Sequence, residues 1–183
     1  MSMTRIQVSE SSDFPLYGIA LVIGTLAGII GAAFHLSLDR IFKAYETLIA
    51  VSGGGWTAVA CTIPLSAGMA VLAVWVTRRF APEAAGSGIQ EIEGAMESKR
   101  VVLWLRALLV KFFGGLLALG AGLVLGREGP TIHMGAAVAK GVADRTDLPQ
   151  HEKRALLAAG AAAGLAAAFN APLAAIVFVT EEM

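Results

Sequence analysis

Two long stretches without a charged residue most strongly constrain what this chain can fold into. One lies between Asp13 and Asp39 and the other between Glu46 and Arg78, and both consist mainly of apolar residues. Each exceeds the roughly 20 residues that an α-helix needs to cross the hydrocarbon core of a bilayer. The first stretch is too long for a secretory signal peptide and lacks a cleavage site of small residues. The pattern therefore predicts two transmembrane helices.

The composition agrees with a membrane protein and argues against several other classes. Apolar residues make up 56% of the chain, charged residues only 15%, and the mean hydropathy is +0.70, whereas soluble proteins carry roughly 25% charge. Fourteen basic and fourteen acidic residues cancel, so no basic surface is available for nucleic acid. The sequence contains no zinc-protease, nucleophile-elbow or phosphate-loop motif. We therefore expect no enzyme activity, no cofactor, no metal site and no nucleic-acid partner.

The second half of the chain has shorter apolar runs, which are interrupted by charges or proline. The uncharged runs 112–126 and 129–139 are too short to span a bilayer alone and predict broken or tilted half-helices. The run 155–180 is split by Asn170 and Pro172, which predicts a helix that ends just before the asparagine and another that starts at the proline. The sequence therefore predicts an all-α, polytopic transmembrane fold with broken and tilted helices.

The charges at positions 39–46 predict a loop between the two long runs. In that loop Arg40 and Lys43 are balanced by two acids, whereas Arg78 and Arg79 follow the second run without such balance. The positive-inside rule then orients the chain with Arg78 and the N-terminus in the cytoplasm. The polar residues 1–13 are expected to form a mobile, cytoplasmic N-terminus.

Three Gly-x-x-x-Gly spacings predict close contacts between helices. They are formed by Gly24 and Gly28, by Gly122 and Gly126, and by Gly160 and Gly164. Each spacing places bare helix surface where another backbone can approach closely. We interpret all three as helix-packing motifs. His35 and His133 lie in apolar helical sequence and are expected to be packed there rather than to bind a metal.

Two glycine-containing segments predict helix N-termini within apolar sequence. Residues 86–91 begin with Gly-Ser-Gly and continue with helix-forming residues, and residues 126–131 place Pro130 in the first turn of the next helix. A helix N-terminus presents unpaired N–H groups and the positive end of the dipole, which favour a bound anion. Ser87 would add a hydroxyl donor. One such terminus contributes only ~0.3–1 kcal/mol when exposed, so several converging donors are needed to offset dehydration of the anion.

Glu128 and Glu182 are acids at the ends of apolar segments. Because Glu128 stands beside a helix N-terminus, its carboxylate occupies the place that an anion would take, and when protonated it is neutral and could swing away. A plain ion pair of Glu128 with Arg127 or with a more distant basic residue is the simpler alternative. Glu182 could likewise mark only the membrane surface. The residues alone leave these alternatives open.

Several motifs together resemble the CLC family of chloride channels and proton-coupled chloride exchangers, and most closely its bacterial exchangers. The motifs, in the family's order, are Gly86-Ser87-Gly88-Ile89, Lys111-Phe112-Phe113-Gly114-Gly115, Gly126-Arg127-Glu128-Gly129-Pro130-Thr131, Phe169-Asn170-Ala171-Pro172 and Glu181-Glu182-Met183. The resemblance begins at about Phe14 and covers the rest of the chain. It implies that residues 14–183 are a partial CLC-type transmembrane domain, the first and truncated member of two inverted repeats.

The resemblance also implies roles for individual residues. Ser87, with Gly88 and Ile89, would bind the central anion. Glu128 would be the gating glutamate that trades places with chloride and carries the proton, and Glu182 would pass protons to and from the cytoplasm. The helix N-terminus at the gate would consist of Gly126, Arg127, Gly129 and Pro130. Gln90 stands where the family usually has proline, which alters the local geometry and makes the preference for chloride less certain.

An acid at position 182 is associated in the family with exchangers, so the resemblance favours H⁺/Cl⁻ antiport. A passive voltage-gated-type chloride channel is one alternative, and a transport-incompetent fragment that needs a second half is another. The implied partners are chloride, protons, membrane lipid and the missing second repeat, with a homodimer as the complete protein. The implied location is the inner (plasma) membrane, which the chain crosses several times.

Overall fold

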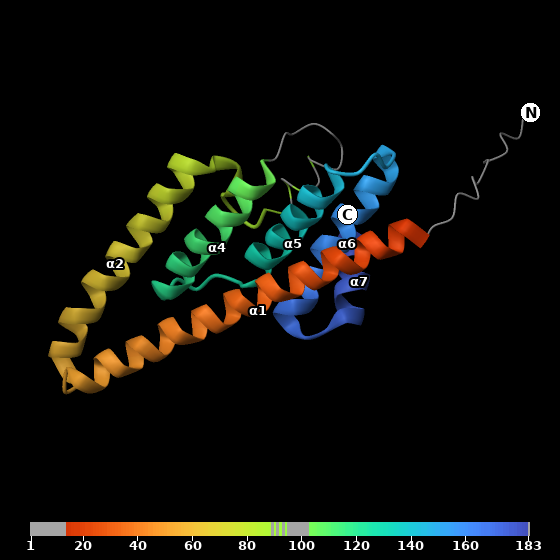
Figure 1. The fold of residues 1–183 in the computed structure, drawn as a ribbon. Coiled ribbons are helices and arrows are strands. Elements are labelled where there is room, and N and C mark those ends of the chain that lie inside the picture. Colours follow the sequence, from red (N-terminus) through yellow and green to blue (C-terminus); the bar gives the residue numbers. More distant parts are fainter. Residues whose placement is uncertain (1–13, 89, 91, 93, 95–102, 183) are drawn as a thin grey trace, which may run out of the picture.

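The computed structural model describes residues 14–88, 90, 92, 94 and 103–182, and in this part of the chain every regular element is helical (Figure 1). The elements are α1 (Phe14–Val51), α2 (Gly55–Phe80), the 3₁₀ turn η1 (Pro82–Ala84), α4 (Trp104–Gly120), α5 (Glu128–Ala143), α6 (Gln150–Phe169) and α7 (Pro172–Glu182). The prediction of an all-α fold is confirmed. The expected mobile segment 1–13 lies outside the described residues.

Helices α1 and α2 are the two long apolar helices that the sequence predicts. Both are long and apolar enough to cross a membrane, and only 22% and 6% of their most apolar windows are buried inside the protein. A core helix of a soluble protein would be mostly buried, so these apolar surfaces require another apolar environment. α1 has 38 residues, roughly 57 Å at 1.5 Å per residue, so in a hydrocarbon core of about 30 Å it would tilt or project beyond it.

The predicted loop at positions 39–46 is wrong, because these residues continue α1 as helix. The chain turns instead after Val51, where Gly53 and Gly54 have φ angles of 73° and 70°. Glycine adopts this left-handed conformation without a steric cost. A helix can continue through charged residues where it reaches the protein surface, whereas consecutive glycines end it. The glycines, and not the charges, therefore mark this turn. The predicted orientation counted the charges of this loop, so it loses that basis.

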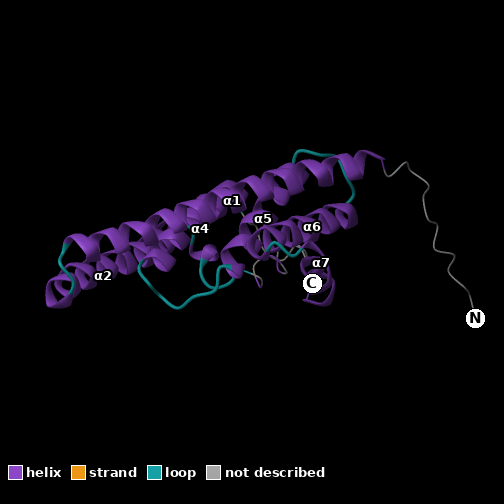
Figure 2. Ribbon diagram, turned by 90° about the horizontal axis from the view of Figure 1, so that it is seen from below, coloured by secondary structure: helices purple, strands orange, loops and turns teal. Residues whose placement is uncertain are grey.

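Helix α5 lies at the centre of the second half, beside α4, α6 and α1 (Figures 1 and 2). Its close approach to α6 depends on glycines on both helices. A Cβ added to Gly135 would lie 3.0 Å from the carbonyl carbon of Gly160, and one added to Gly164 would lie 2.8 Å from the carbonyl carbon of Thr131. Only glycine permits backbones to approach this closely. The packing role predicted for Gly160 and Gly164 is thereby confirmed.

The other two glycine spacings behave differently. Gly122 and Gly126 lie in the loop between α4 and α5, and Gly122 has a φ of 80°, so their prediction as a helix-packing motif is wrong. Their spacing falls where the helix has already ended at Gly120. Gly24 and Gly28 do lie on α1, but an added Cβ at either would meet no atom within 4 Å. That face of α1 is open within the described part of the chain.

The predicted break between the last two helices is confirmed. α6 ends at Phe169, Asn170 adopts the left-handed conformation with φ 53°, and α7 starts at Pro172. Asparagine is one of the few residues that accept this conformation at a helix end, and proline suits a helix start. The break turns α7 back along α6, and Ala175 and Val179 pack into a buried cluster with Ile132 of α5 and other apolar residues.

Candidate functional site

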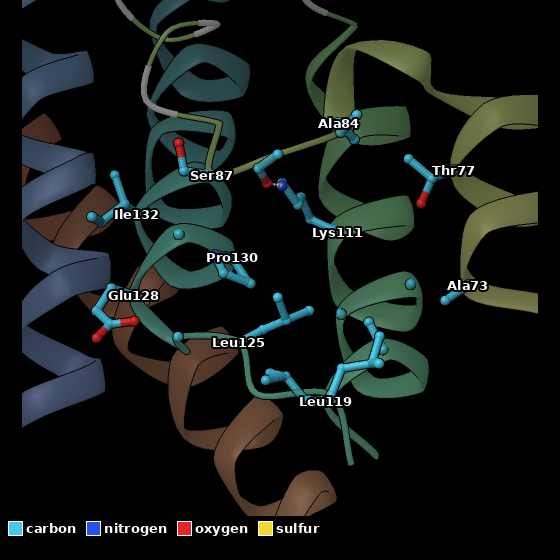
Figure 3. A pocket seen from close by; sticks show the side chains of 18 of the residues that line it. Ala73, Thr77, Ala84, Ser87, Lys111, Leu119, Leu125, Glu128, Pro130 and Ile132 are labelled. Atoms are coloured by element: carbon cyan, nitrogen blue, oxygen red, sulfur yellow. Dashed lines mark hydrogen bonds between the residues drawn. The ribbon is translucent and has the colours of Figure 1, made fainter. Parts of the chain in front are cut away.

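A cavity of about 1300 Å³ opens among α2, α4, α5, α6 and α7 (Figure 3). Most of its lining residues are Ala, Gly, Leu and other apolar residues. The polar or charged side chains in its lining are those of Thr77, Arg78, Ser87, Lys111 and Glu128. A mostly apolar cavity with a few polar groups is typical of a binding site for a small ligand. Two of the acids and donors singled out in the sequence, Ser87 and Glu128, therefore share one cavity.

Residues 86–88, which we call the Ser87 loop, connect η1 to the helical turn that follows. Gly86 and Gly88 have φ angles of 69° and 87°, a region that favours glycine. The carbonyl oxygen of Gly88 accepts a hydrogen bond of 3.1 Å from the N–H of Ile92, and residues 90, 92 and 94 are helical. A helical segment therefore starts directly after the loop, as predicted. Ile89, predicted to be in the anion site, lies outside the described residues.

The N-terminus of α5 lies against the Ser87 loop. α5 begins at Glu128, and the hydroxyl of Thr131 donates to the carbonyl oxygens of Arg127 and Glu128, at 3.1 and 2.9 Å, which closes the first turn. A Cβ added to Gly129 would lie 3.0 Å from the Cα and the carbonyl oxygen of Ser87. Glycine at position 129 thus lets the two predicted helix N-termini meet directly. Pro130 lines the cavity in the same turn.

The Glu128 side chain folds back over the N-terminus of its own helix. Its carboxyl carbon lies 2.9 Å from the position that a Cβ on Gly126 would take, and its oxygens lie against the same position. A glycine at 126 therefore leaves the space in which the carboxylate rests. An acid in the first turn is stabilised by the helix dipole. The same interaction attracts an anion, so the carboxylate and an anion would compete for this end of α5.

The simpler alternative for Glu128, an ion pair with Arg127, is not what the structure shows. A guanidinium nitrogen of Arg127 lies 3.4 Å from Nδ1 of His35 on α1. Across the described ranges, no ion pair joins Glu128 to a basic residue. Arg127 precedes Glu128 in the sequence, but its guanidinium lies against His35 on α1.

Lys111 is the residue of this site that sequence reasoning missed. It lies on α4 with only 6% of its surface exposed, and its ammonium donates a hydrogen bond of 2.6 Å to the carbonyl oxygen of Gly86 (Figure 3). Among the residues that the structure describes, no carboxylate lies within ion-pair distance of it. A lysine between uncharged apolar runs is itself a signal of function, because burying a charge in such a segment is costly. The fold adds that this cation holds the Ser87 loop.

Glu182 is not brought to the cavity. It is the last residue of α7 and is exposed, whereas Phe178, one turn earlier on the same helix, lines the cavity. Ser87, Gly126, Glu128, Gly129 and Pro130 therefore gather at one place, and Glu182 lies beyond it along α7.

Comparison with known proteins assigns this chain to a family. Residues 67–183 match the family model described as "Voltage gated chloride channel". The matched segment contains the Ser87 loop, Lys111, the α5 N-terminus and α7. The chain belongs to the voltage-gated chloride channel (CLC) family.

Curated relatives carry the name H(+)/Cl(-) exchange transporter ClcA. The chain is 48% identical to the one from Vibrio campbellii over 177 residues, which covers 96% of this chain and 38% of the relative. It is 50% identical to the one from Vibrio parahaemolyticus over 175 residues, covering 94% of this chain and 38% of the relative. It is 49% identical to the one from Klebsiella pneumoniae, covering all of this chain and 39% of the relative. The chain thus spans about two fifths of the length of these relatives.

Solved structures show the same fold. A slow cyanobacterial Cl⁻/H⁺ antiporter aligns with a TM-score of 0.86 at 39% identity, covering 91% of this chain and 40% of that protein. A eukaryotic CLC transporter aligns with a TM-score of 0.76 at 25% identity, covering 91% of this chain and 33% of that protein. The predicted fold, a helical part of a CLC-type transporter, is therefore confirmed. The family and the exposed apolar helices together show that this is a membrane protein.

Proposed function

We propose that this chain carries the part of an H⁺/Cl⁻ antiporter that binds the anion and gates its passage. The single observation that carries this proposal is the cavity in which Ser87, the N-terminus of α5 and the Glu128 carboxylate meet. The names of the relatives support exchange of chloride for protons as the activity. Because the chain spans only part of those proteins, transport by a whole protein is part of the proposal.

The anion would bind where several partial positive charges converge. Ser87 lines the cavity just before the helical turn that follows it, and the N-terminus of α5 lies directly beside it. The buried ammonium of Lys111 adds a full positive charge at the rear of the loop. Each helix terminus alone contributes little, but a buried cation acts through a medium of low dielectric constant, where its attraction for an anion is much stronger than in water.

Proton coupling would follow from competition at the end of α5. When Glu128 is ionised, its carboxylate occupies the anion's place; when it takes up a proton it loses the attraction of the helix dipole and leaves that place to chloride. Each time chloride replaces the carboxylate, Glu128 has taken up a proton, so the movements of the two ions are coupled. Glu182, at the end of α7, would deliver protons from the cytoplasmic side. Arg127, whose guanidinium lies against His35 of α1, would position the N-terminus of α5 rather than neutralise the Glu128 carboxylate.

The finer assignments belong to the same proposal. Residues 1–13 would lie in the cytoplasm, residues 14–183 would be part of the first of two inverted repeats, and Ile89 would complete the anion site beside Gly88. The complete protein would be a homodimer in the inner membrane, in contact with lipid along α1 and α2. The exposed apolar faces of these two helices support the contact with lipid.

The test is proton movement driven by a chloride gradient in liposomes. Two proteins are compared: the 183-residue chain, and a chimera in which residues 14–182 replace the matching segment of the Vibrio parahaemolyticus exchange transporter. We expect the chimera to move protons uphill, and the Glu182→Gln chimera to keep chloride flux while losing proton flux. Chloride flux without protons in the unaltered chimera would favour a passive channel. Flux from the chimera but none from the chain alone would show that a second half is required.

A separate prediction concerns Lys111. Replacing it by methionine (Lys111→Met) removes the positive charge and the hydrogen bond to Gly86 but keeps most of the side-chain volume. We expect the chloride concentration for half-maximal flux in the chimera to rise about tenfold, which corresponds to about 1.4 kcal/mol. Lys43→Met, at an exposed position on α1, is the control. An unchanged chloride dependence in Lys111→Met would remove this lysine from the anion site.

A further inference from the structure

The Ser87 loop is held from α5 at two positions. Gly129 packs on the backbone of Ser87, and four residues further along α5 the side chain of His133 packs on Gly88. A Cβ added to Gly88 would lie 2.6 Å from Cγ and 2.9 Å from Cβ of His133, and Nδ1 would collide with it as well. Positions four apart lie on the same face of a helix. One face of α5 therefore supports Ser87 and Gly88, whereas Gly86 is bound by Lys111 of α4.

His133 is buried in a way that packing alone does not explain. Only 2% of its surface is exposed, and among the residues that the structure describes its Nδ1 has no hydrogen-bond partner. A buried polar atom without a partner costs free energy that an apolar side chain at the same position would not incur. The imidazole points this atom at Gly88. Its role is therefore to be sought in the loop that it touches.

Gly88 is the residue through which such a contact acts on the site. Its carbonyl oxygen accepts the hydrogen bond from Ile92 that starts the next helical turn. Its φ of 87° lets the chain reverse direction directly after Ser87. Any movement of Gly88 would therefore move both the Ser87 hydroxyl and the first N–H groups of the following turn.

We propose that His133 is a positioning residue for anion binding: by packing on Gly88 it holds the Ser87 loop in the geometry that presents its donors to the cavity. The inference rests on the proposed function, because it assigns His133 a part in binding the anion at Ser87. His133 is not itself a ligand. Gly86 and Ser87 line the cavity, and His133 supports them from the buried side of α5.

The test measures amide hydrogen exchange of the chimera in phosphatidylcholine–phosphatidylglycerol liposomes, as chloride replaces gluconate at constant ionic strength. In the unaltered chimera, chloride should slow exchange in the peptide that contains the Ser87 loop. In His133→Ala we expect faster exchange there, and the chloride concentration for half-maximal protection should rise about tenfold. Exchange in α2 should not change. His133→Gln, which keeps a polar group of similar length, should restore much of the protection.

The outcomes separate the two ideas. If chloride protects the loop equally well in the unaltered chimera and in its His133→Ala variant, the inference fails while the proposed function stands. If chloride has no effect on the loop of the unaltered chimera, the proposed anion site fails and the inference fails with it. His151→Ala is the matched control, because that imidazole has 80% of its side chain exposed, at the start of α6.

A second pair of variants tests the contact directly. In Gly88→Ala the new methyl group collides with His133, so we expect the loop to exchange faster even though residue 133 is unchanged. In the His133→Ala background the ring atoms are gone, although the Cβ of residue 133 stays 2.9 Å from the new methyl group and the positive φ of residue 88 still disfavours alanine. The same substitution should therefore add a smaller effect there. Independent, additive effects of the two substitutions would show that the contact does not hold the loop.

Discussion

Glu128→Gln is expected to abolish proton movement while leaving chloride movement intact. Glutamine has the shape of the protonated acid, carries no charge and cannot release a proton, so it no longer competes with chloride for the N-terminus of α5. We expect chloride-driven uphill proton flux of the chimera to fall by at least about 100-fold, the lower range for loss of a group that transfers protons. The measurement is simultaneous recording of chloride and external pH in liposomes.

The matched control for this variant is Glu152→Gln. Glu152 is also an acid in the first turn of a helix, in α6, but it does not line the cavity within the part of the chain that the structure describes. It should leave both fluxes unchanged. Persistent proton flux in Glu128→Gln would mean that another group carries the proton. The proposal that this cavity couples the two ions would then be wrong.

The fold was predictable where a single local signal decides it. Asn170 and Pro172 end one helix and begin another at the residues expected, because a left-handed asparagine and an N-terminal proline act through their own backbone geometry. The charges at 39–46 misled, because a helix can carry charges at the end of an apolar span, whereas the glycines after Val51 cannot continue it.

The candidate site was predictable in its residues but not in its contacts. Ser87 and Glu128 are marked by glycine, serine and proline chemistry at helix starts, and the structure brings them to one cavity. The contacts of Lys111 with Gly86 and of His133 with Gly88 join residues far apart in the sequence. Such contacts depend on how the helices pack, and no local pattern specifies that packing.

Gly135→Ala is expected to destabilise the chain strongly, because α5 and α6 have no room for a methyl group between them. The added Cβ would lie 3.0 Å from the backbone carbon of Gly160 and 3.0 Å from the backbone nitrogen of Gly164. Backbone cannot rotate away as a side chain can, so the two helices must separate. Overpacking of this kind costs about 1–3 kcal/mol, which for a chain of this size lowers the melting temperature by roughly 2–12 °C.

Gly24→Ala isolates the packing contribution. Both substitutions replace a helical glycine by alanine and so gain the same helix propensity, about 1 kcal/mol, but a Cβ at Gly24 meets no atom within 4 Å. The difference between the two melting temperatures, followed by circular dichroism in detergent, therefore reports the α5–α6 contact alone. Equal melting temperatures would contradict the close approach of these helices. Because α5 also carries Glu128, Gly129 and His133, a helix displaced by Gly135→Ala should lose chloride-dependent protection of the Ser87 loop as well.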